Sequence, residues 1–282
     1  MGEFGLEVVL VPITTSGDRQ QQGPIEAIGG RGVFTKEIQR ALLDDRIDLA
    51  VHSLKDLPTD PVEGLCLAAV PERAPAGDVL VCRERASLDD LPEGAVLGTG
   101  SLRRRAQLLH VRPDLRVKDV RGNVDTRLRK LDRGDYDALV LAEAGLRRLG
   151  MAERITQVLP TSVALPAVGQ GALGLETRSD DDLARRAVQN LDHPATHAAV
   201  LAERAMLAAL QGGCLAPIAA SSRVEDALLT LTGRVLHPDG TEKIEASESG
   251  DPAEPAQLGN RVADALFAQG AAKLIQAARQ TG

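Results

Sequence analysis

Aromatic residues are scarce in this chain of 282 residues, which has three Phe, one Tyr and no Trp. A nucleic-acid surface built on stacked aromatic rings is therefore not expected. The formal net charge of −7 also argues against a general polyanion binder. The sequence has no apolar run of about 18 residues and no basic region followed by an apolar one at its start, so we expect neither a membrane span nor a signal peptide. We expect a cytoplasmic protein that binds no nucleic acid and no membrane.

Cysteine is also rare, and its three positions exclude two common uses. Cys66, Cys82 and Cys214 are an odd, widely spaced set without a C-x-x-C pair, so neither a disulfide framework nor a zinc site is expected. Cys66 and Cys82 stand in apolar runs and are predicted to be buried, inert thiols. Cys214 follows two glycines, Gly212 and Gly213, and a thiol on such a loop can be reached by a ligand. No metal site is predicted.

Strand-like and helix-like segments alternate over the first two thirds of the chain, which predicts an α/β fold with a mainly parallel sheet. The polar segment Arg19–Gly32 has no periodicity and is expected to be a mobile lid loop. Strands are predicted at Leu6–Thr15, Ile47–Leu54, Leu65–Val70, Val79–Arg83, Ala95–Thr99, Arg116–Val120 and Ala138–Ala142, and helices at Thr35–Arg46, Leu102–Val111, Thr126–Leu131 and Ala144–Leu149.

The pattern of predicted helices and strands changes after Asp192. A helix is predicted from Pro194 to about Leu210, a strand at Leu228–Leu236, and a final helix from about Ala256 to Ala278. We interpret this tail as a separate α+β domain.

Positive charge is concentrated in one segment of this acidic chain. Residues 101–148 contain 13 Lys or Arg and 7 Asp or Glu, a net charge of +6. Several of these arginines stand where a predicted strand passes into a helix: Arg103 and Arg104 follow Gly98-Thr99-Gly100-Ser101. Backbone N–H groups and guanidinium groups at such junctions bind carboxylate or phosphate. The segment as a whole favours a ligand with several negative charges, although any one arginine could lie on a solvated helix face.

Three further candidates have competing interpretations. Asp56 follows the predicted strand Ile47–Leu54 and could stabilise a developing cation, or it could be a turn residue before Pro58. His52 could be a hydrogen-bonded core histidine or a ligand contact. The string Gly169–Gly174 matches G-x-G-x-x-G, but an extended segment follows it where the dinucleotide fingerprint needs a helix, so we reject dinucleotide binding.

Seven motifs stand in an order that identifies a family. They are Val51–Pro58, Gly98–Arg104, Arg121–Arg127, Ala144–Gly150, Leu165–Gly171, Glu203–Met206 and Gly212–Cys214. With them the chain resembles the porphobilinogen deaminase family, also called hydroxymethylbilane synthases, over nearly its full length.

The resemblance implies two α/β domains similar to type II periplasmic binding proteins, which flank a cleft, and a small C-terminal α+β domain. Domain 1 would comprise residues 1–73 and 172–190, domain 2 residues 74–171, and domain 3 residues 191–282. The resemblance also implies a dipyrromethane cofactor, bound through a thioether to Cys214. The reaction would be the head-to-tail condensation of four porphobilinogen molecules into hydroxymethylbilane, with release of ammonia, in the biosynthesis of tetrapyrroles such as haem. The family is usually monomeric.

The resemblance further assigns roles to residues of this chain. Asp56 would be catalytic, by hydrogen-bonding the pyrrole N–H and stabilising the cationic intermediate. Cofactor and substrate contacts would come from Ser53, Lys55, Thr99, Ser101, Arg103, Arg104, Arg121, Arg127, Arg148 and Gln170, together with Arg31 and Phe34 at the lid loop. Arg31 stands where the family usually has Lys.

The start of the chain departs from the family pattern. Nothing in Met1–Gly5 matches the usual first strand with its Arg-x-Ser motif or the helix after it. We therefore expect a first domain that lacks this strand and helix, and is less stable for it. Two alternatives stay open: an inactive, shortened form of the same fold, and a cytoplasmic two-lobed module that binds an anion.

Overall fold

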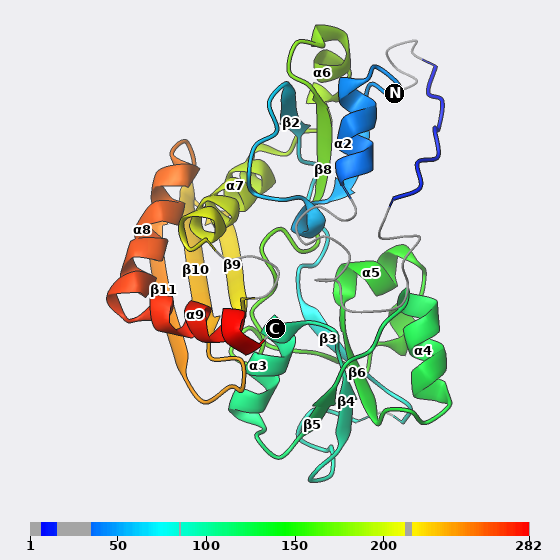
Figure 1. The fold of residues 1–282 in the computed structure, drawn as a ribbon, viewed down its shortest axis with the longest axis vertical. Helices are drawn as coiled ribbons and strands as arrows, with labels where there is room; N and C mark the ends of the chain where they lie inside the picture. The colour runs from blue at the N-terminus through cyan, green and yellow to red at the C-terminus, as the bar shows by residue number, and fades with distance from the viewer. Residues whose placement is uncertain (1–6, 16–34, 85, 212–215, 282) are drawn as a thin grey trace. The chain divides into compact units, whose positions relative to one another are not determined.

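The computed structural model describes residues 7–15, 35–84, 86–211 and 216–281. The chain, drawn in Figure 1, divides into two compact units by its internal contacts. Unit 1 contains Met1–Arg73 and Ala172–His197, and unit 2 contains Ala74–Gly171 and Ala198–Gly282. The architecture mixes helices and strands in both units, in agreement with the predicted α/β class.

Unit 1 is built on a three-stranded antiparallel sheet in the order β1-β8-β2. The apolar residues Ala69, Leu175 and Val188 form a small core between this sheet and its helices. The strands are β1 (Ala50–Ser53), β2 (Leu65–Ala69) and β8 (Leu173–Arg178), the helices are α2 (Lys36–Leu43) and α6 (Asp182–Gln189), and a 3₁₀ turn, η3 (Leu54–Asp56), follows β1.

The strand predicted at Leu6–Thr15 is wrong for the part that the structure describes. Residues 7–15 have no regular secondary structure, and Val9 and Leu10 are 72% and 90% exposed. Apolar residues favour a strand only where a neighbouring strand accepts and donates the backbone hydrogen bonds. No strand among the described residues pairs with this segment.

The larger sheet of unit 2 has five strands in the order β5-β4-β6-β3-β7. Strand β4 is parallel to β5 and β6, whereas β3 is antiparallel to β6 and β7, so the prediction of a mainly parallel sheet is wrong. The sequence pattern does not distinguish these cases, because β3 and β6 are buried on both faces and read as continuous apolar runs. The strands are β3 (Asp78–Cys82), β4 (Val96–Gly98), β5 (Arg116–Lys118), β6 (Ala138–Ala142) and β7 (Gln157–Val158).

Helices cover both faces of this sheet. Leu80 of β3 and Val140 of β6 pack with Leu108 on one face, and Val79 and Leu139 contribute to the core on the other. The helices are α3 (Leu102–Val111), α4 (Val124–Asp132) and α5 (Glu143–Arg148), followed by the 3₁₀ turn η4 (Ala152–Arg154). The predicted range of α3 is confirmed, and its first turn is capped by Ser101, whose Oγ accepts a hydrogen bond from the backbone N–H of Arg104.

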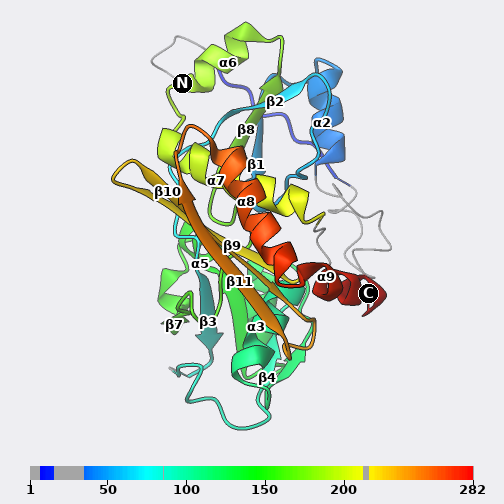
Figure 2. The same ribbon diagram turned by 90° about the vertical axis from the view of Figure 1, so that its left-hand side faces the viewer.

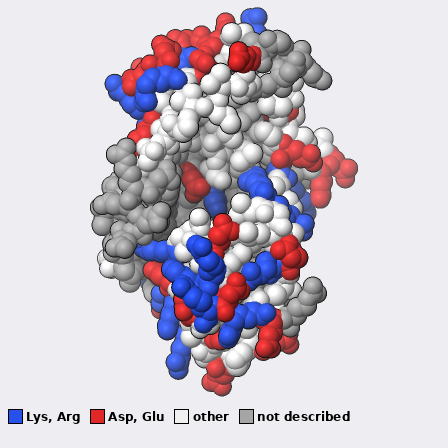
Figure 3. Space-filling view, turned by 90° about the vertical axis from the view of Figure 1, so that its right-hand side faces the viewer, with Lys and Arg blue, Asp and Glu red and all other residues white. Residues whose placement is uncertain are grey.

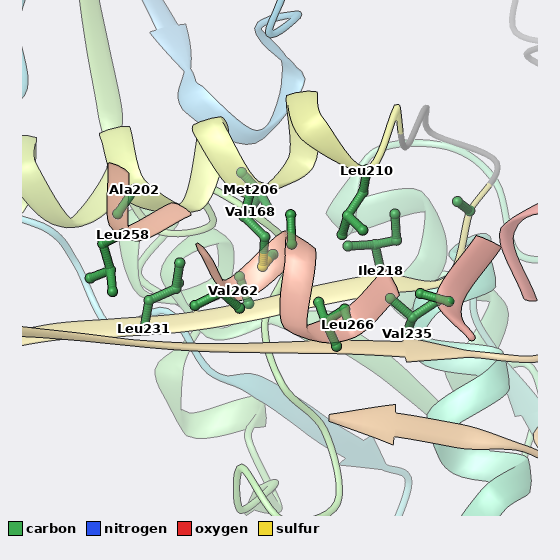
Figure 4. Packing of buried hydrophobic residues seen from close by; sticks show 14 of the residues in the cluster. Val168, Ala202, Met206, Leu210, Ile218, Leu231, Val235, Leu258, Val262 and Leu266 are labelled. Atoms are coloured by element: carbon green, nitrogen blue, oxygen red, sulfur yellow. The ribbon is translucent and has the colours of Figure 1, made fainter. Parts of the chain in front are cut away.

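The C-terminal part of unit 2 is an antiparallel sheet, β9-β10-β11, with helices on one face. Figures 1 and 2 show α8 running along the sheet, and Figure 4 shows Met206, Val262 and Leu266 in the core between them. The elements are α7 (Pro194–Ala209), which begins in unit 1, β9 (Ile218–Glu225), β10 (Leu228–Leu236), β11 (Lys243–Gly250), α8 (Pro255–Ala268) and α9 (Ala271–Thr281).

The single final helix predicted from about Ala256 to Ala278 is in fact two helices. Gly270 separates α8 from α9 with a φ of +101°, a left-handed conformation that glycine adopts without steric cost. The apolar pattern is regular on both sides of this glycine, so the sequence alone does not indicate that one helix ends and another begins there.

A buried ion cluster joins β3 to α3 in unit 2. Asp78 is fully buried, and its carboxylate lies 2.6 Å from Nη1 of Arg103 and 2.8 Å from Nη2 of Arg104. Burial by itself would raise the pKa of Asp78, but the charges and hydrogen bonds of the two arginines hold it well below its ordinary value of 3.8. The cluster therefore contributes stability that depends on an ionised Asp78.

We predict that Asp78→Asn lowers the free energy of unfolding by about 3–5 kcal/mol at neutral pH, because two buried guanidinium groups lose their counter-ion. Since the pKa of Asp78 is lower in the folded state, the stabilisation is present above about pH 4 and is lost as the pH falls through the folded-state value. Urea unfolding followed by circular dichroism at several pH values measures both effects, and the variant should lose this part of the acid sensitivity.

The matched control is Asp132→Asn, which removes the surface ion pair with Arg154. A surface pair contributes about 0–1 kcal/mol, so this variant should remain close to the wild type. Equal destabilisation by the two substitutions would contradict the special role of Asp78.

Candidate functional site

In unit 1, the turn η3 presents two charged side chains to solvent. Leu54 and Leu57 are buried, whereas Lys55 and Asp56 between them are exposed. The turn is fixed by the backbone N–H of Leu54, which donates to the carbonyl of Ala172 at 3.1 Å. Leu54 also packs so closely over Gly174 that a Cβ there would lie 2.6 Å from Leu54 Cδ1. The strand end thus holds Asp56 at a defined position.

The surroundings of Asp56 alter its proton affinity. Asp56 keeps contact with solvent, yet partial burial of its carboxyl raises the pKa of that group. The charge of Lys55 and the electrostatic effect of the nearby His52 act in the opposite direction. A carboxyl with a raised pKa exchanges protons closer to neutral pH than an ordinary aspartate does. This property suits a group that carries protons or meets a developing cation.

His52 lies in the interior of unit 1, and one of its ring nitrogens has a buried partner. Its Nε2 lies 2.9 Å from Oε2 of Glu176, and both side chains are buried. The other carboxylate oxygen of Glu176 accepts a hydrogen bond from Gln39 Nε2 at 2.9 Å. Of the two interpretations of His52, the structure supports the hydrogen-bonded core histidine. Ser53 is half-buried between this pair and η3.

In unit 2, the end of β4 and the start of α3 bring Thr99 and Ser101 beside Arg103 and Arg104. Thr99 is buried and its N–H donates to the carbonyl of Lys118, while Ser101 N–H donates to Thr99 Oγ1 at 3.3 Å. The two arginines are almost wholly buried against Asp78. Two guanidinium charges face one carboxylate, so the cluster keeps a net charge of +1 at the helix start, where the helix dipole also favours anions.

Arg127 and Arg148 add positive charge that no acid in the described part of the chain pairs with. Among the described residues, neither forms a salt bridge with a carboxylate. Arg127 Nε donates to the carbonyl of Gly122 and Arg148 Nη2 to that of Gly171, both at 2.7 Å. Burial and the nearby charge of Arg104 lower the pKa of Arg127. Positive charges that lie close together repel one another, and an anion bound among them reduces this repulsion.

Positively charged side chains are also frequent on the surface of unit 2. On the side that carries α4 and α5, Lys and Arg side chains are numerous among scattered Asp and Glu (Figure 3). Arg121 is half-buried before α4, and its backbone carbonyl accepts a hydrogen bond from Lys130 Nζ at 3.3 Å.

The segment Gly169–Gly171 is a tight crossing of the backbone. Gly169 and Gly171 have φ values of +70° and +85°, and a Cβ on Gly171 would lie 2.5 Å from the carbonyl oxygen of Ala74. Strand β8 follows this segment, so the rejection of a dinucleotide fingerprint is confirmed. The buried Gln170 donates from Nε2 to Asp78 Oδ1 at 2.9 Å and to the carbonyl of Ala76 at 2.6 Å.

The predicted site residues thus form two groups, each inside one unit. Unit 1 brings together Ser53, Lys55 and Asp56, and unit 2 brings together Thr99, Ser101, Arg103, Arg104 and Gln170, with Arg127 close to Arg104. Arg148 contacts the backbone next to Gln170. Arg31, Phe34 and Cys214 lie outside the described residues, as does the expected lid Arg19–Gly32.

Two buried acids beside these candidate residues received no individual role from the sequence, although Glu203 stands in one of the seven motifs. Asp78 supports both arginines, and Glu203 of α7 accepts hydrogen bonds from Gly169 N–H at 2.7 Å and from Ser222 Oγ at 2.6 Å. Both acids are fully buried. A carboxylate at the start of the apolar run 79–82 is a signal that could have identified Asp78, since a buried charge requires a partner.

The described parts of the chain contain neither a metal-binding group of side chains nor a helix that could span a membrane. No group of three His, Cys, Asp or Glu there is arranged to hold a metal ion. None of the helices there combines the length and apolarity that crossing a membrane requires.

The sequence matches known proteins over most of its length. Family models match residues 2–186 ("Porphobilinogen deaminase, dipyromethane cofactor binding domain") and 197–268 ("Porphobilinogen deaminase, C-terminal domain"). The porphobilinogen deaminase of Desulforudis audaxviator (strain MP104C) is 52% identical over 267 residues, which are 95% of this chain and 86% of the relative. That of Syntrophotalea carbinolica (strain DSM 2380 / NBRC 103641 / GraBd1) is 48% identical over 273 residues, covering 97% and 87%.

The similarity to solved structures is much lower. An ancestral cationic amino acid solute-binding protein matches with a TM-score of 0.40 and 17% identity, over 67% of this chain and 72% of that one. This level is too low to assign a fold. The two family models and the two relatives agree, and they show that the chain belongs to the porphobilinogen deaminase family.

Proposed function

We propose that this chain is a hydroxymethylbilane synthase, a transferase that joins four porphobilinogen molecules head to tail and releases ammonia at each addition, in tetrapyrrole biosynthesis. The observation that carries the proposal is the family match over residues 2–186 and 197–268, together with 52% identity to a porphobilinogen deaminase. The geometry of both units is consistent with the chemistry of that reaction.

The residues of unit 2 fit a dipyrromethane cofactor. Each pyrrole unit carries acetate and propionate groups, so the cofactor and a chain growing on it hold many carboxylates. Arg127 and Arg148 have no carboxylate partner among the described residues, and the α3 start holds a net +1 cluster. Guanidinium groups bind carboxylates through paired hydrogen bonds, so these arginines suit the carboxylates of the cofactor and of the growing chain.

We assign the cofactor contacts to Arg103, Arg104, Arg121, Arg127 and Arg148, with hydroxyl and amide contacts from Ser53, Thr99, Ser101 and Gln170. Arg31 and Phe34 would add a cation and a stacking ring from the lid. Cys214 would hold the cofactor through a thioether. When bound, the dipyrromethane supplies the nucleophilic pyrrole carbon to which the first substrate is joined.

Asp56 is the residue to which we assign the chemical step. Loss of ammonia from porphobilinogen leaves an electron-poor pyrrole that carries positive charge. An ionised Asp56 accepts a hydrogen bond from the pyrrole N–H and stabilises that charge as it develops. Its raised pKa also allows it to move protons between the ring and the leaving amine. Lys55 beside it is a cationic contact for substrate carboxylates.

From the sequence we further propose that the chain works as a monomer in the cytoplasm, without nucleic acid or membrane. Sedimentation at working concentration tests the first point, and a dimer would contradict it.

We predict that Asp56→Asn lowers kcat for hydroxymethylbilane formation by about 100-fold or more, because a neutral amide cannot stabilise the cation. Asp56→Glu, which keeps the charge, should retain part of the activity. In the wild type, kcat/KM should fall on the acid side at a pH above 3.8, the ordinary aspartate value, because the pKa of Asp56 is raised. Asp60→Asn in the same loop serves as the control and should keep full activity. Full turnover by Asp56→Asn would remove Asp56 from the catalytic role.

Replacement of Arg127 or Arg148 by Met should raise KM for porphobilinogen by about 10- to 100-fold, with a smaller effect on kcat. The estimate corresponds to the loss of one charge-assisted hydrogen bond of about 1.5–3 kcal/mol. Arg154→Met is the matched control, because Arg154 lies in the same part of unit 2 but pairs with Asp132. An unchanged KM in both site variants would speak against a carboxylate-binding role.

Intact-protein mass spectrometry tests the covalent link. Protein made in a cell that supplies porphobilinogen should carry the added mass of one dipyrromethane, and Cys214→Ala should lack it. Cys66→Ala should keep it, because the Cys66 thiol is partly buried and contacts Thr177. Unmodified wild-type protein would instead favour an inactive form of this fold or a module that binds an anion without turnover.

A further inference from the structure

Arg234 on β10 is buried where the strand pattern predicts exposure. Leu229, Leu231 and Val235 point into the core under α8, and Thr230 and Thr232 on the opposite face are only partly buried. Arg234 belongs to this second face, yet it is only 4% exposed. A buried arginine needs partners for its N–H donors, and these partners show what the residue does.

All three nitrogens of the Arg234 guanidinium have partners, and two of them bond outside its own sheet. Nε donates to Glu245 Oε2 at 2.6 Å on the neighbouring strand β11. Nη1 donates to Gln107 Oε1 at 2.8 Å on α3, and Nη2 donates to the carbonyl of Thr161 at 3.1 Å. The residue thus ties the C-terminal sheet to α3 and to the segment before Leu165.

The network continues from Gln107 to the start of α3. Gln107 Nε2 donates to the carbonyl of Leu165 at 3.0 Å, and Gln107 Oε1 accepts from Leu165 N–H at 2.8 Å. The same Leu165 carbonyl accepts a hydrogen bond from Arg103, which pairs with Asp78. An unbroken series of hydrogen bonds therefore runs from Arg234 to the ion cluster below Ser101.

We propose that Arg234 is a positioning residue, which acts through Gln107 and Leu165 to hold the first turn of α3 in the orientation that binds ligand carboxylates. This inference rests on the proposed function, in which Ser101, Arg103 and Arg104 contact the cofactor or substrate. Arg234 itself touches no reacting atom. Side chains that bind a ligand need such support, because small displacements of a binding group reduce its contribution strongly.

The test compares Arg234→Met with Arg261→Met in the full-length protein. Arg261 lies in the same C-terminal part and pairs with Glu248 at the surface, without contact to α3. Arg234→Met should raise KM for porphobilinogen by about tenfold while kcat changes little, and Arg261→Met should change neither. Similar KM effects in both variants, or none in Arg234→Met, would overturn the proposal.

Hydrogen exchange provides a readout that does not depend on activity. Amides of residues 101–111 should exchange faster in Arg234→Met than in the wild type, with no such change in Arg261→Met. Unchanged exchange in α3 would refute the positioning role. If the wild type makes no hydroxymethylbilane, the proposed function fails, whereas the exchange result still decides whether Arg234 holds α3.

A double-variant cycle tests the route through Gln107. If Arg234 acts through it, the effect of Arg234→Met combined with Gln107→Met on KM should be smaller than the product of the two single effects. Independent, multiplying effects would contradict this route. Should Arg234→Met fail to fold, Arg234→Lys keeps one charge without the planar fork and tests the same exchange and KM changes.

Discussion

The carboxylate of Asp78 is a negative charge in the buried interior of unit 2. The residues around it provide the partners that such a charge needs. Arg103 and Arg104 neutralise that charge, and Gln170 donates to the same carboxylate. Through these bonds a single acid fixes the start of α3 to β3 and to the backbone crossing at Gly171. Both arginines are held by Asp78 and still leave a surplus positive charge, so in the proposed function one interaction serves both stability and anion binding.

The partners of each arginine separate structural roles from ligand-binding roles. Arg178 is surrounded by carboxylates from Asp45, Asp48 and Asp181, and it has no charge left to offer a ligand. Arg127 and Arg148 donate only to backbone carbonyls in the described contacts, which leaves their positive charge uncompensated. In the proposed function, a substrate with several carboxylates would supply the missing negative charge. The distribution of acids therefore supports the proposed ligand contacts as much as the distribution of arginines does.

Much of the site could be predicted from the sequence because its residues stand in short, local motifs. Ser101 caps α3 through a bond three residues away, and the burial of Leu54 and Leu57 exposes Asp56 between them. Such relations depend on helix and turn geometry, which neighbouring residues specify. The sequence did not indicate which partners Asp78, Glu203 and Arg234 would have, since these partners lie 11 to 127 residues away along the chain.

The sequence by itself determined the type of most of the helices and strands that it predicted, the order of the motifs and the family. It could not determine strand direction, because β3 is apolar on both faces and that pattern is the same in parallel and antiparallel neighbours. It also could not show that residues 7–15 lack a strand partner or that α8 and α9 separate at Gly270. Only the tertiary structure decided which buried charges meet, because ion pairing depends on distance in space and leaves no periodic signal along the chain.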